Sequence, residues 1–433
     1  MIGIVGGGIS GLFLLHFLRE RGMDAILFEA LSAPGGVMRS VVVDGPFGPV
    51  TTDLGPQRVR LTGGLRTIVD EVGLGPSTVS APSGTPFNVL HHGRLLPVPL
   101  SLRQAVATRL ISPAGKVRAL GDLFREEPRP EESVAEALER KLGAEVSKRL
   151  AAPLLGGLYA SDPARMEARD TLMPALERAG GGRSILLALL RAAKWERLPV
   201  VSFSDGMGAL PRALAEVHST HVRLGCPVAA IEPRGAGGFE VVLGNAVDRI
   251  PVKEVVLTLP APEASPLLEP LSGDAGRRLA SLRYNPLAVV PLVASDRGTL
   301  RQVGTGFKVT EEDDYATRGV TAHEALFDRR GLFTAFLGGM GREALCDRSD
   351  DEILETARAD FQRITGTEAT PLLVHRTRMP AWDRSWRSMD DLVLPQGIHL
   401  CAAYADRPGI TGRLESARRT ADRLADARVT TDA

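Results

Sequence analysis

Three glycines near the N-terminus restrict what this chain can fold into. The chain opens with MIGIVGGGISGL, in which Gly6, Gly8 and Gly11 follow the apolar residues 2–5. The apolar run predicts a buried parallel strand. Glycines in this spacing allow a tight turn, a close approach of the backbone to a pyrophosphate and close packing of the next helix on the strand. That helix is expected to begin near Ser10, where its dipole favours a phosphate.

An acidic residue follows at the sequence separation that is typical of nucleotide-binding units. The second apolar run, AILF at 25–28, ends in Glu29, which can accept hydrogen bonds from a ribose. A carboxylate here argues against a 2′-phosphate and therefore against NADP. Strand, glycines, helix and acid together predict a βαβ unit that binds a dinucleotide; a glycine-rich turn in an ordinary α/β protein is the alternative.

Two further glycine pairs indicate which dinucleotide is bound. Gly35 and Gly36, followed by Arg39, offer a second close backbone approach, which suits an extended flavin adenine dinucleotide (FAD) and which NAD does not require. Near the C-terminus, Gly409 and Gly412 open a predicted helix whose free amides could face the pyrimidine end of a reduced flavin. Each pair alone is typical of turns. Their shared order predicts FAD.

Composition and motif content exclude several other classes of protein. The 433 residues carry 52 basic and 52 acidic side chains, so no net field favours nucleic acid. Cys226, Cys346 and Cys401 match no metal or redox spacing, which favours a reducing, cytoplasmic setting. The N-terminus lacks the basic flank of a signal peptide, and no apolar run reaches the ~18 residues of a membrane span. No motif of catalytic or metal-binding side chains stands out, so we expect neither.

The chain divides into stretches of different pattern. Residues 1–80 alternate between strands and helices, residues 101–197 are helical and are broken by Pro and Gly clusters, and strand-like runs return afterwards. A chain of this length is expected to form two or three domains. The pattern predicts an α/β protein with an all-helical insertion.

The order of the motifs resembles the protoporphyrinogen/coproporphyrinogen oxidase group of the flavin amine-oxidase superfamily over nearly the whole length. The matching stretches include GGGISGL, DLGPQRV at 53–59, GRLLPVP at 93–99, EESVAEALERKLGAEVSKRLAAPLLGGLYASDP at 131–163, VSFSDGMGALPRAL at 201–214 and VVLTLPAPEASPLLEPLS at 255–272. The resemblance implies three domains: a Rossmann-type FAD-binding domain assembled from 1–80, 198–258 and 394–433, an α+β substrate domain of 81–100 and 259–393, and a helical, membrane-associating-type domain of 101–197.

The resemblance also implies which residues bind the cofactor. Gly55 and Pro56 would lie near the isoalloxazine ring, and Val228 would contact the adenine side. Gly157 would line the substrate cavity, and Trp382 stands where the family usually has an aromatic residue near the flavin. The remaining cofactor-binding positions would be Ile9, Ala30, Thr258, Ala403 and Ile410.

The implied activity is the oxygen-dependent oxidation of a porphyrinogen to the porphyrin in haem synthesis. The substrate would be protoporphyrinogen IX or coproporphyrinogen III, and hydride would pass to the flavin, which oxygen reoxidises. Because the cofactor carries the difficult step, the protein has to supply placement, an apolar cavity and charge near the flavin. Side-chain catalysis is not required.

Phe87 departs from the family pattern at the position that bears on the substrate. Family members commonly carry a basic residue there, which can hold a substrate propionate, and phenylalanine cannot replace it. Arg58, Arg60 or Arg94 could supply the charge instead. The departure favours one alternative, a flavin oxidase of another substrate such as an amine. A flavin-binding protein without turnover is a third possibility, which Ala402 and Ala403 would permit because they replace a glycine-containing segment of the family.

A basic amphipathic segment raises the question of a membrane partner. RSILLALLRAAK has an apolar face, with Arg183, Arg191 and Lys194 near its ends. Such a helix could rest on a membrane surface. We favour the alternative that it packs on the substrate cavity. Peripheral membrane contact is therefore the weaker of the two predictions.

Overall fold

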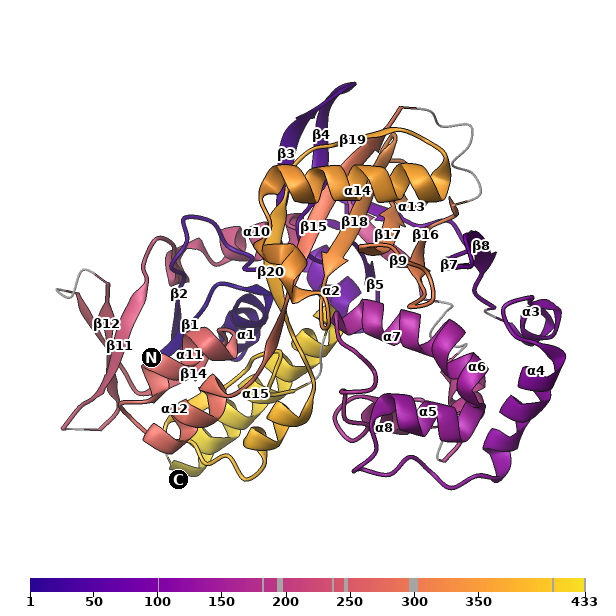
Figure 1. The fold of residues 1–433 in the computed structure, drawn as a ribbon. Coiled ribbons are helices and arrows are strands. Elements are labelled where there is room, and N and C mark those ends of the chain that lie inside the picture. Colours follow the sequence, from indigo (N-terminus) through magenta and orange to yellow (C-terminus); the bar gives the residue numbers. More distant parts are fainter. Residues whose placement is uncertain are drawn as a thin grey trace.

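Parallel strands from separate stretches of the chain build the first sheet (Figure 1). The computed structural model describes residues 1–99, 101–180, 183–192, 198–235, 237–244, 248–295, 303–406 and 409–431. In this described part the strand order is β10 (Val222–Arg223), β2 (Ala25–Phe28), β1 (Ile2–Val5), β14 (Glu254–Leu257) and β21 (Ile398–Leu400). Every neighbouring pair is parallel, as in sheets that are covered on both faces.

Two helices far apart in the sequence pack together on this sheet. They are α1 (Ile9–Glu20) and α15 (Ile410–Thr431), which lie side by side in Figure 1. Because α1 is apolar on most sides, its residues from Ser10 to Leu18 are all buried. The same core takes in α2 (Gly63–Glu71) and α10 (Ala209–Val217).

Smaller antiparallel elements surround this sheet. A hairpin joins β3 (Ser40–Gly45) to β4 (Gly48–Asp53), and β9 (Val200–Phe203) pairs with both β5 (Val59–Arg60) and β6 (Thr78–Ser80). A further antiparallel sheet contains β11 (Val228–Pro233), β12 (Phe239–Leu243) and β13 (Arg249–Val252). Helices α11 (Ala261–Leu268) and α12 (Gly273–Ala280) follow.

A larger, mostly antiparallel sheet forms the second body. Its described strands run in the order β19 (Ala369–Pro371), β15 (Tyr284–Ala294), β18 (Leu332–Gly338), β17 (Thr317–Ala322), β16 (Gly306–Val309), β7 (Asn88–His91) and β8 (Arg94–Pro97), while β20 (His375–Pro380) also pairs with β15. Helix α14 (Asp350–Thr365) covers one face, where Phe361 packs with Val290 and Leu337. The short helix α13 (His323–Phe327) precedes β18.

Residues 101–192 supply helices α3 (Leu102–Ala107), α4 (Pro113–Leu120), α5 (Val134–Leu142), α6 (Ala144–Val146), α7 (Ala152–Tyr159), α8 (Leu172–Arg178) and α9 (Ile185–Ala192). Gly143, with φ of +92°, separates α5 from α6. A π-helical turn, η3 (Ser147–Ala151), then leads into α7. None of the described helices combines the length and apolarity needed to cross a bilayer.

A buried carboxylate joins the N-terminal part of the chain to the larger sheet. Asp53, at the end of β4, is fully buried, and its Oδ1 accepts hydrogen bonds from Ser40 Oγ (2.5 Å) and from the amide of Met207 (2.7 Å). Its Oδ2 accepts a hydrogen bond from Arg329 Nη1 at 2.7 Å. A Cβ at Gly206 would lie 2.5 Å from Asp53 Oδ1, so this approach depends on glycine. The ion pair thus ties residues 40–53 and 206–207 to the larger sheet.

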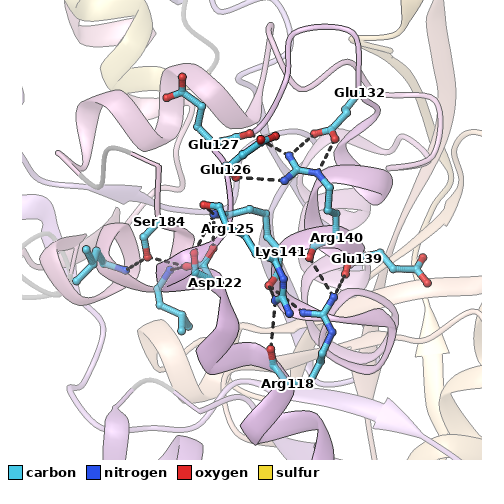
Figure 2. Close-up of polar contacts among 12 residues, drawn as sticks. Arg118, Asp122, Arg125, Glu126, Glu127, Glu132, Glu139, Arg140, Lys141 and Ser184 are labelled. Carbon is cyan, nitrogen blue, oxygen red and sulfur yellow. Dashed lines mark hydrogen bonds and ion pairs between the residues drawn. The ribbon is translucent and has the colours of Figure 1, made fainter.

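A second buried ion pair organises the helical region (Figure 2). Lys141 Nζ, on α5, lies 2.9 Å from Asp122 Oδ1, and both side chains are inaccessible to solvent. The ammonium also donates to the carbonyls of Asp122 (3.0 Å) and Arg125 (3.1 Å). Asp122 Oδ2 accepts hydrogen bonds from Ser184 Oγ (2.6 Å) and from the amide of Leu186 (2.9 Å) at the start of α9. The pair therefore connects three segments of this region.

Removing one partner of this pair should destabilise the helical region. Burial alone would raise the pKa of Asp122, but hydrogen bonds from Ser184, Leu186 and Lys141 outweigh it and hold that pKa below its ordinary value. We expect Lys141→Met to lower the free energy of unfolding by about 3–5 kcal/mol, because it leaves a buried, unpaired carboxylate. Hydrogen exchange of peptides from residues 101–192 would show the loss.

The exposed Lys148 provides the matched control for this prediction, since Lys148→Met removes a charge from the same region and should change stability by less than about 0.5 kcal/mol. Because the folded-state pKa of Asp122 is depressed, the wild-type contribution is present above the unfolded pKa and is lost as pH falls through the folded pKa. Equal exchange in the two variants, or a wild-type contribution that grows on acidification, would contradict the assignment.

Candidate functional site

The first glycine turn is shaped by how closely the backbone packs. Gly6 has φ of +114° and donates its amide hydrogen bond to the carbonyl of Phe28. A Cβ at Gly11 would lie 2.1 Å from the carbonyl oxygen of Gly6, so no side chain fits between turn and helix. Among the residues that the structure describes, a Cβ at Gly8 would meet nothing within 4 Å, and no side chain caps the N-terminus of α1. The amides at Ile9 and Ser10 therefore begin a helix that an anion can approach.

Glu29 holds this turn against the end of β2. Its Oε2 accepts a hydrogen bond from the amide of Gly7 at 2.6 Å, and its Oε1 accepts one from the amide of Leu31 at 2.8 Å. A Cβ at Gly7 would lie 2.7 Å from Glu29 Cβ, a constraint that the spacing of the other glycines does not reveal. Each carboxylate oxygen can accept a further hydrogen bond. Ala30, the next residue, is exposed.

The second glycine pair lies against the first turn. The amide of Gly35 donates to the carbonyl of Gly7 at 2.8 Å, and a Cβ at Gly36 would lie 3.3 Å from the Cα of Gly8. Both glycines have positive φ, +120° and +58°, which disfavours other residues. Nearby in the sequence, Arg39 has a buried Nε that finds no hydrogen-bond partner within the described residues. An anionic ligand would satisfy that donor.

Two of the residues expected to contact the cofactor, Thr258 and Val228, come from later parts of the chain and lie near the first glycine turn. Thr258, after β14, donates its hydroxyl hydrogen bond toward the carbonyls of Val5 (3.0 Å) and Gly6 (2.8 Å), so it supports the turn. Val228 begins β11 and is half-buried. It follows Cys226, whose amide donates to the carbonyl of Glu29 at 2.8 Å, which brings this strand alongside the acid.

The C-terminal positions lie at the start of α15. Gly409 has φ of +80° and is exposed, Ile410 is the first helical residue and is buried, and Ala403 is half-buried in the loop before them. Gly412 lies inside the helix. Arg413, one position further, is also buried, and burial lowers the pKa of its guanidinium.

The segment 53–58 packs on the face of the larger sheet opposite to α14. A Cβ at Gly55 would lie 1.9 Å from the carbonyl oxygen of Val37, so the chain passes here without a side chain. Pro56 is half-buried. The amide of Gln57 donates to the carbonyls of Asp53 (2.9 Å) and Gly55 (2.7 Å), and its Oε1 accepts a hydrogen bond from Thr334 Oγ1 on β18 at 3.4 Å.

The three positions expected at the substrate cavity lie on different elements. Phe87, just before β7, is half-buried and packs beside Val89 against the helical region. Trp382 is buried, with φ of +53°, and its ring stacks on Trp386 at 5.0 Å. Gly157 falls within α7, and its surroundings are outside the described residues.

Several residues that shape the site were not predicted from the sequence. Asp53 and Gln57 lie in the quoted DLGPQRV stretch, and Gly206 lies in VSFSDGMGALPRAL. The hydrogen bonds of Asp53 to Arg329 and of Gln57 to Thr334, and the close approach of Gly206 to Asp53, are contacts between segments that are distant in the sequence. The only available signal was the conjunction of an acid with nearby glycines. Such a signal does not name the partner.

Two groups of side chains in the described part come close enough to ligate a metal ion: His91 with His92 and Glu312, and His16 with Glu20 and Glu71. The buried His16 shares a hydrogen bond of 3.0 Å with Glu71, whereas His91 Nδ1 lies 3.1 Å from Glu312 Oε2 without a hydrogen bond among the described residues.

Comparison with known proteins places the chain in a family. The family model for flavin containing amine oxidoreductases matches residues 9–425. Protoporphyrinogen oxidase 1 from chloroplasts of Spinacia oleracea is 30% identical over 402 residues, covering 83% of this chain and 70% of that protein. Coproporphyrinogen III oxidase of Bacillus subtilis is 24% identical over 409 residues, covering 87% and 85%.

Solved structures show the same fold. A candidate protoporphyrinogen oxidase from Exiguobacterium superimposes with a TM-score of 0.78 at 24% identity, covering 98% of each chain. Cyclohexylamine oxidase from Brevibacterium oxydans superimposes with a TM-score of 0.68 at 15% identity, again covering 98% of each chain. These likenesses confirm the predicted α/β fold class. The chain belongs to the flavin-containing amine oxidoreductase family, within its protoporphyrinogen/coproporphyrinogen oxidase group, and is an FAD-dependent oxidoreductase.

Proposed function

We propose that this enzyme oxidises a porphyrinogen, either protoporphyrinogen IX or coproporphyrinogen III, to the porphyrin in haem synthesis, with oxygen as electron acceptor. The observation that carries the proposal is the 30% identity to a protoporphyrinogen oxidase over 83% of the chain. The related coproporphyrinogen oxidase keeps the second substrate open. Residues 1–80, 198–258 and 394–433 would form the FAD domain, 81–100 and 259–393 the substrate domain, and 101–197 the helical domain.

The described residues fit FAD. The open space at Gly8, the uncapped start of α1 and the unpartnered Nε of Arg39 suit the pyrophosphate, and Glu29 retains acceptor capacity for a ribose. The residues that would hold the cofactor are Gly6, Gly8, Ile9, Ser10, Gly11, Glu29, Ala30, Gly35, Gly36, Arg39, Gly55, Pro56, Val228, Thr258, Ala403, Gly409 and Ile410. When bound, FAD supplies the hydride acceptor.

The protein's own part is to position the substrate and to exclude water. Burial is the main cause that lowers the pKa of His323 to about 3, so this histidine, which bonds to Thr334 Oγ1 beside Gln57, is neutral at physiological pH. Burial also lowers the pKa of His375 on β20. The face next to segment 53–58 therefore carries uncharged histidines, in keeping with a reaction that needs no side-chain acid. Phe87, Gly157 and Trp382 would border the substrate.

An amine is the second candidate substrate. Putrescine oxidase and cyclohexylamine oxidase share the fold, although at 15–18% identity the likeness extends to the fold alone. A phenylalanine where a propionate-binding residue is common favours this candidate. Sequence similarity to the porphyrinogen oxidases through the helical region opposes it.

Loss of the Glu29 carboxylate should weaken FAD binding. We expect Glu29→Ala to weaken binding by about tenfold or more, because the Gly7 amide and the ribose lose a charged acceptor. The ratio of flavin to protein absorbance, followed by titration of the apoprotein with FAD, measures the change. Glu216→Ala, at an exposed position on α10, is the matched control and should bind FAD as the wild type does. Unchanged affinity in Glu29→Ala would show that the ribose lies elsewhere.

The substrate assignment predicts oxygen-dependent appearance of porphyrin fluorescence. Purified enzyme, supplied in parallel with protoporphyrinogen IX, coproporphyrinogen III, putrescine and cyclohexylamine, should consume oxygen with one or both porphyrinogens. The flavin should remain oxidised in the presence of the amines. Porphyrin must form faster than in an enzyme-free control, since porphyrinogens also oxidise spontaneously. A flavin-loaded enzyme that reacts only with an amine would establish the second candidate.

We also propose peripheral membrane contact, through a surface other than α9. In α9, Ile185 and Ala188 are buried, and Lys194 lies outside the described residues. On α4 and the following turn η2 (Gly121–Phe124), by contrast, Val117, Leu120 and Phe124 are exposed, Phe124 at 88%. Exposed apolar side chains gathered on neighbouring turns suit insertion between lipid headgroups.

Charge introduced at this surface should abolish vesicle binding. We expect the wild type to float with vesicles that contain anionic lipid, and the variant with Val117→Glu and Phe124→Glu to stay in the soluble fraction. Val393→Glu, at another exposed valine, should float as the wild type does. A wild type that does not float, or equal loss in both variants, would argue against membrane contact here.

A further inference from the structure

A lysine faces the interior of the molecule from the sheet surface that α14 leaves uncovered. Lys308 on β16 lies opposite Gly319 on β17, which in turn lies opposite Phe336 on β18. Directly paired residues of antiparallel strands share a face of the sheet. The three positions therefore form one row across it.

This row determines the path of the Lys308 side chain across the sheet. A Cβ at Gly319 would lie 2.7 Å from Lys308 Cδ and 3.2 Å from its Nζ, so the lysine side chain runs over the glycine. Its ammonium lies 5.5 Å from the centre of the Phe336 ring, at cation–π distance. A larger residue at 319 would push the lysine out of this course.

The same face is the one that meets segment 53–58. Thr334 precedes Phe336 by two residues on β18, so both side chains lie on one face, and Thr334 bonds to Gln57. The intervening Ala335 and the following Leu337 pack on the other face, with Phe361 of α14. Lys308 therefore lies on the same face of the sheet as segment 53–58, which in the proposed function borders the flavin.

Positive charge accumulates on this side. Burial lowers the pKa of Lys308 to about 8, with Arg58 and Arg318 as the charged neighbours that lower it further. Burial is also the main cause that lowers the pKa of Arg58, assisted by Arg60. Lys308 and Arg58 nevertheless keep partial solvent accessibility. Like charges brought together at depth disfavour one another, and an anion among them would relieve this repulsion.

Lys308 also lies next to the position where a basic residue is missing. β16 pairs in parallel with β7, with Lys308 opposite Val89, and Phe87 lies two residues before Val89. The lysine is thus on the strand adjacent to Phe87. Of the arginines considered from the sequence, Arg60 and Arg94 are exposed, whereas Arg58 is half-buried and is the first of the charged neighbours that lower the pKa of Lys308.

We propose that Lys308, assisted by Arg58, binds a carboxylate group of the substrate, in place of a basic residue at position 87. The inference rests on the proposed function, because tetrapyrrole substrates carry propionates. It makes Lys308 a specificity-determining residue: the lysine requires an anionic group on the substrate and takes no part in hydride transfer.

Binding of a porphyrin with and without free carboxylates tests the proposal. The probes are protoporphyrin IX and its dimethyl ester, titrated by fluorescence into the full-length, FAD-loaded enzyme. Lys308→Met should weaken binding of the free acid by about tenfold or more and leave binding of the ester within about twofold of the wild type. Lys308→Arg should restore most of the affinity for the acid. Lys253→Met, at an exposed lysine, should alter neither.

The outcomes separate this inference from the proposed function. A wild type that binds the acid through Lys308 but oxidises no porphyrinogen would leave the carboxylate site intact and refute the function. If the enzyme oxidises porphyrinogens but Lys308→Met binds both the acid and the ester as tightly as the wild type does, the proposed function stands and the carboxylate site is refuted. Equal losses for both probes, or a wild type that binds neither probe, would also overturn the proposal.

Discussion

The buried ion pair between Asp53 and Arg329 is the interaction on which the arrangement of the site depends. Segments that are distant in the sequence meet at one carboxylate, which accepts hydrogen bonds from Ser40, Met207 and Arg329. A fully buried carboxylate is costly unless its acceptors are satisfied, and here a charged partner and two further donors do so. Loss of Arg329 would leave a buried charge unpaired, and loss of either neutral donor would leave Oδ1 one hydrogen bond short, so these contacts favour a single arrangement of the segments.

This constraint carries over directly to segment 53–58. Gln57 reaches back to the carbonyl of Asp53 and across to Thr334, so the segment is held at both ends against the larger sheet. Gly55 then passes within contact of Val37, close to the second glycine pair. The first glycine turn and the face of the larger sheet opposite α14 are thereby held in one relative position, which in the proposed function would align the cofactor with the substrate.

The sequence predicted what depends on neighbouring residues and missed what depends on distant ones. The first turn was predictable because strand, glycines, helix and Glu29 occur within 30 residues, and α14 because its apolar spacing and capping residues are local. Within the helical region, Gly143 ends α5 through its positive φ, which is again a local property. The pairing of Asp53 with Arg329 spans 276 positions, and neither residue has a local pattern that names the other. Family resemblance supplied positions, but not these contacts.

The position of Lys308 shows why a missing residue need not mean a missing function. Adjacent strands of a sheet lie only about 5 Å apart, so a charge lost from one strand can be supplied by the next without moving the ligand far. The exchange is possible only if the new side chain has room, and Gly319 provides that room. In the proposed carboxylate site, the glycine at 319 therefore leaves room for the charge that position 87 lacks. Substrate class is better judged from the charge of the whole face than from the single position at which relatives carry a basic residue.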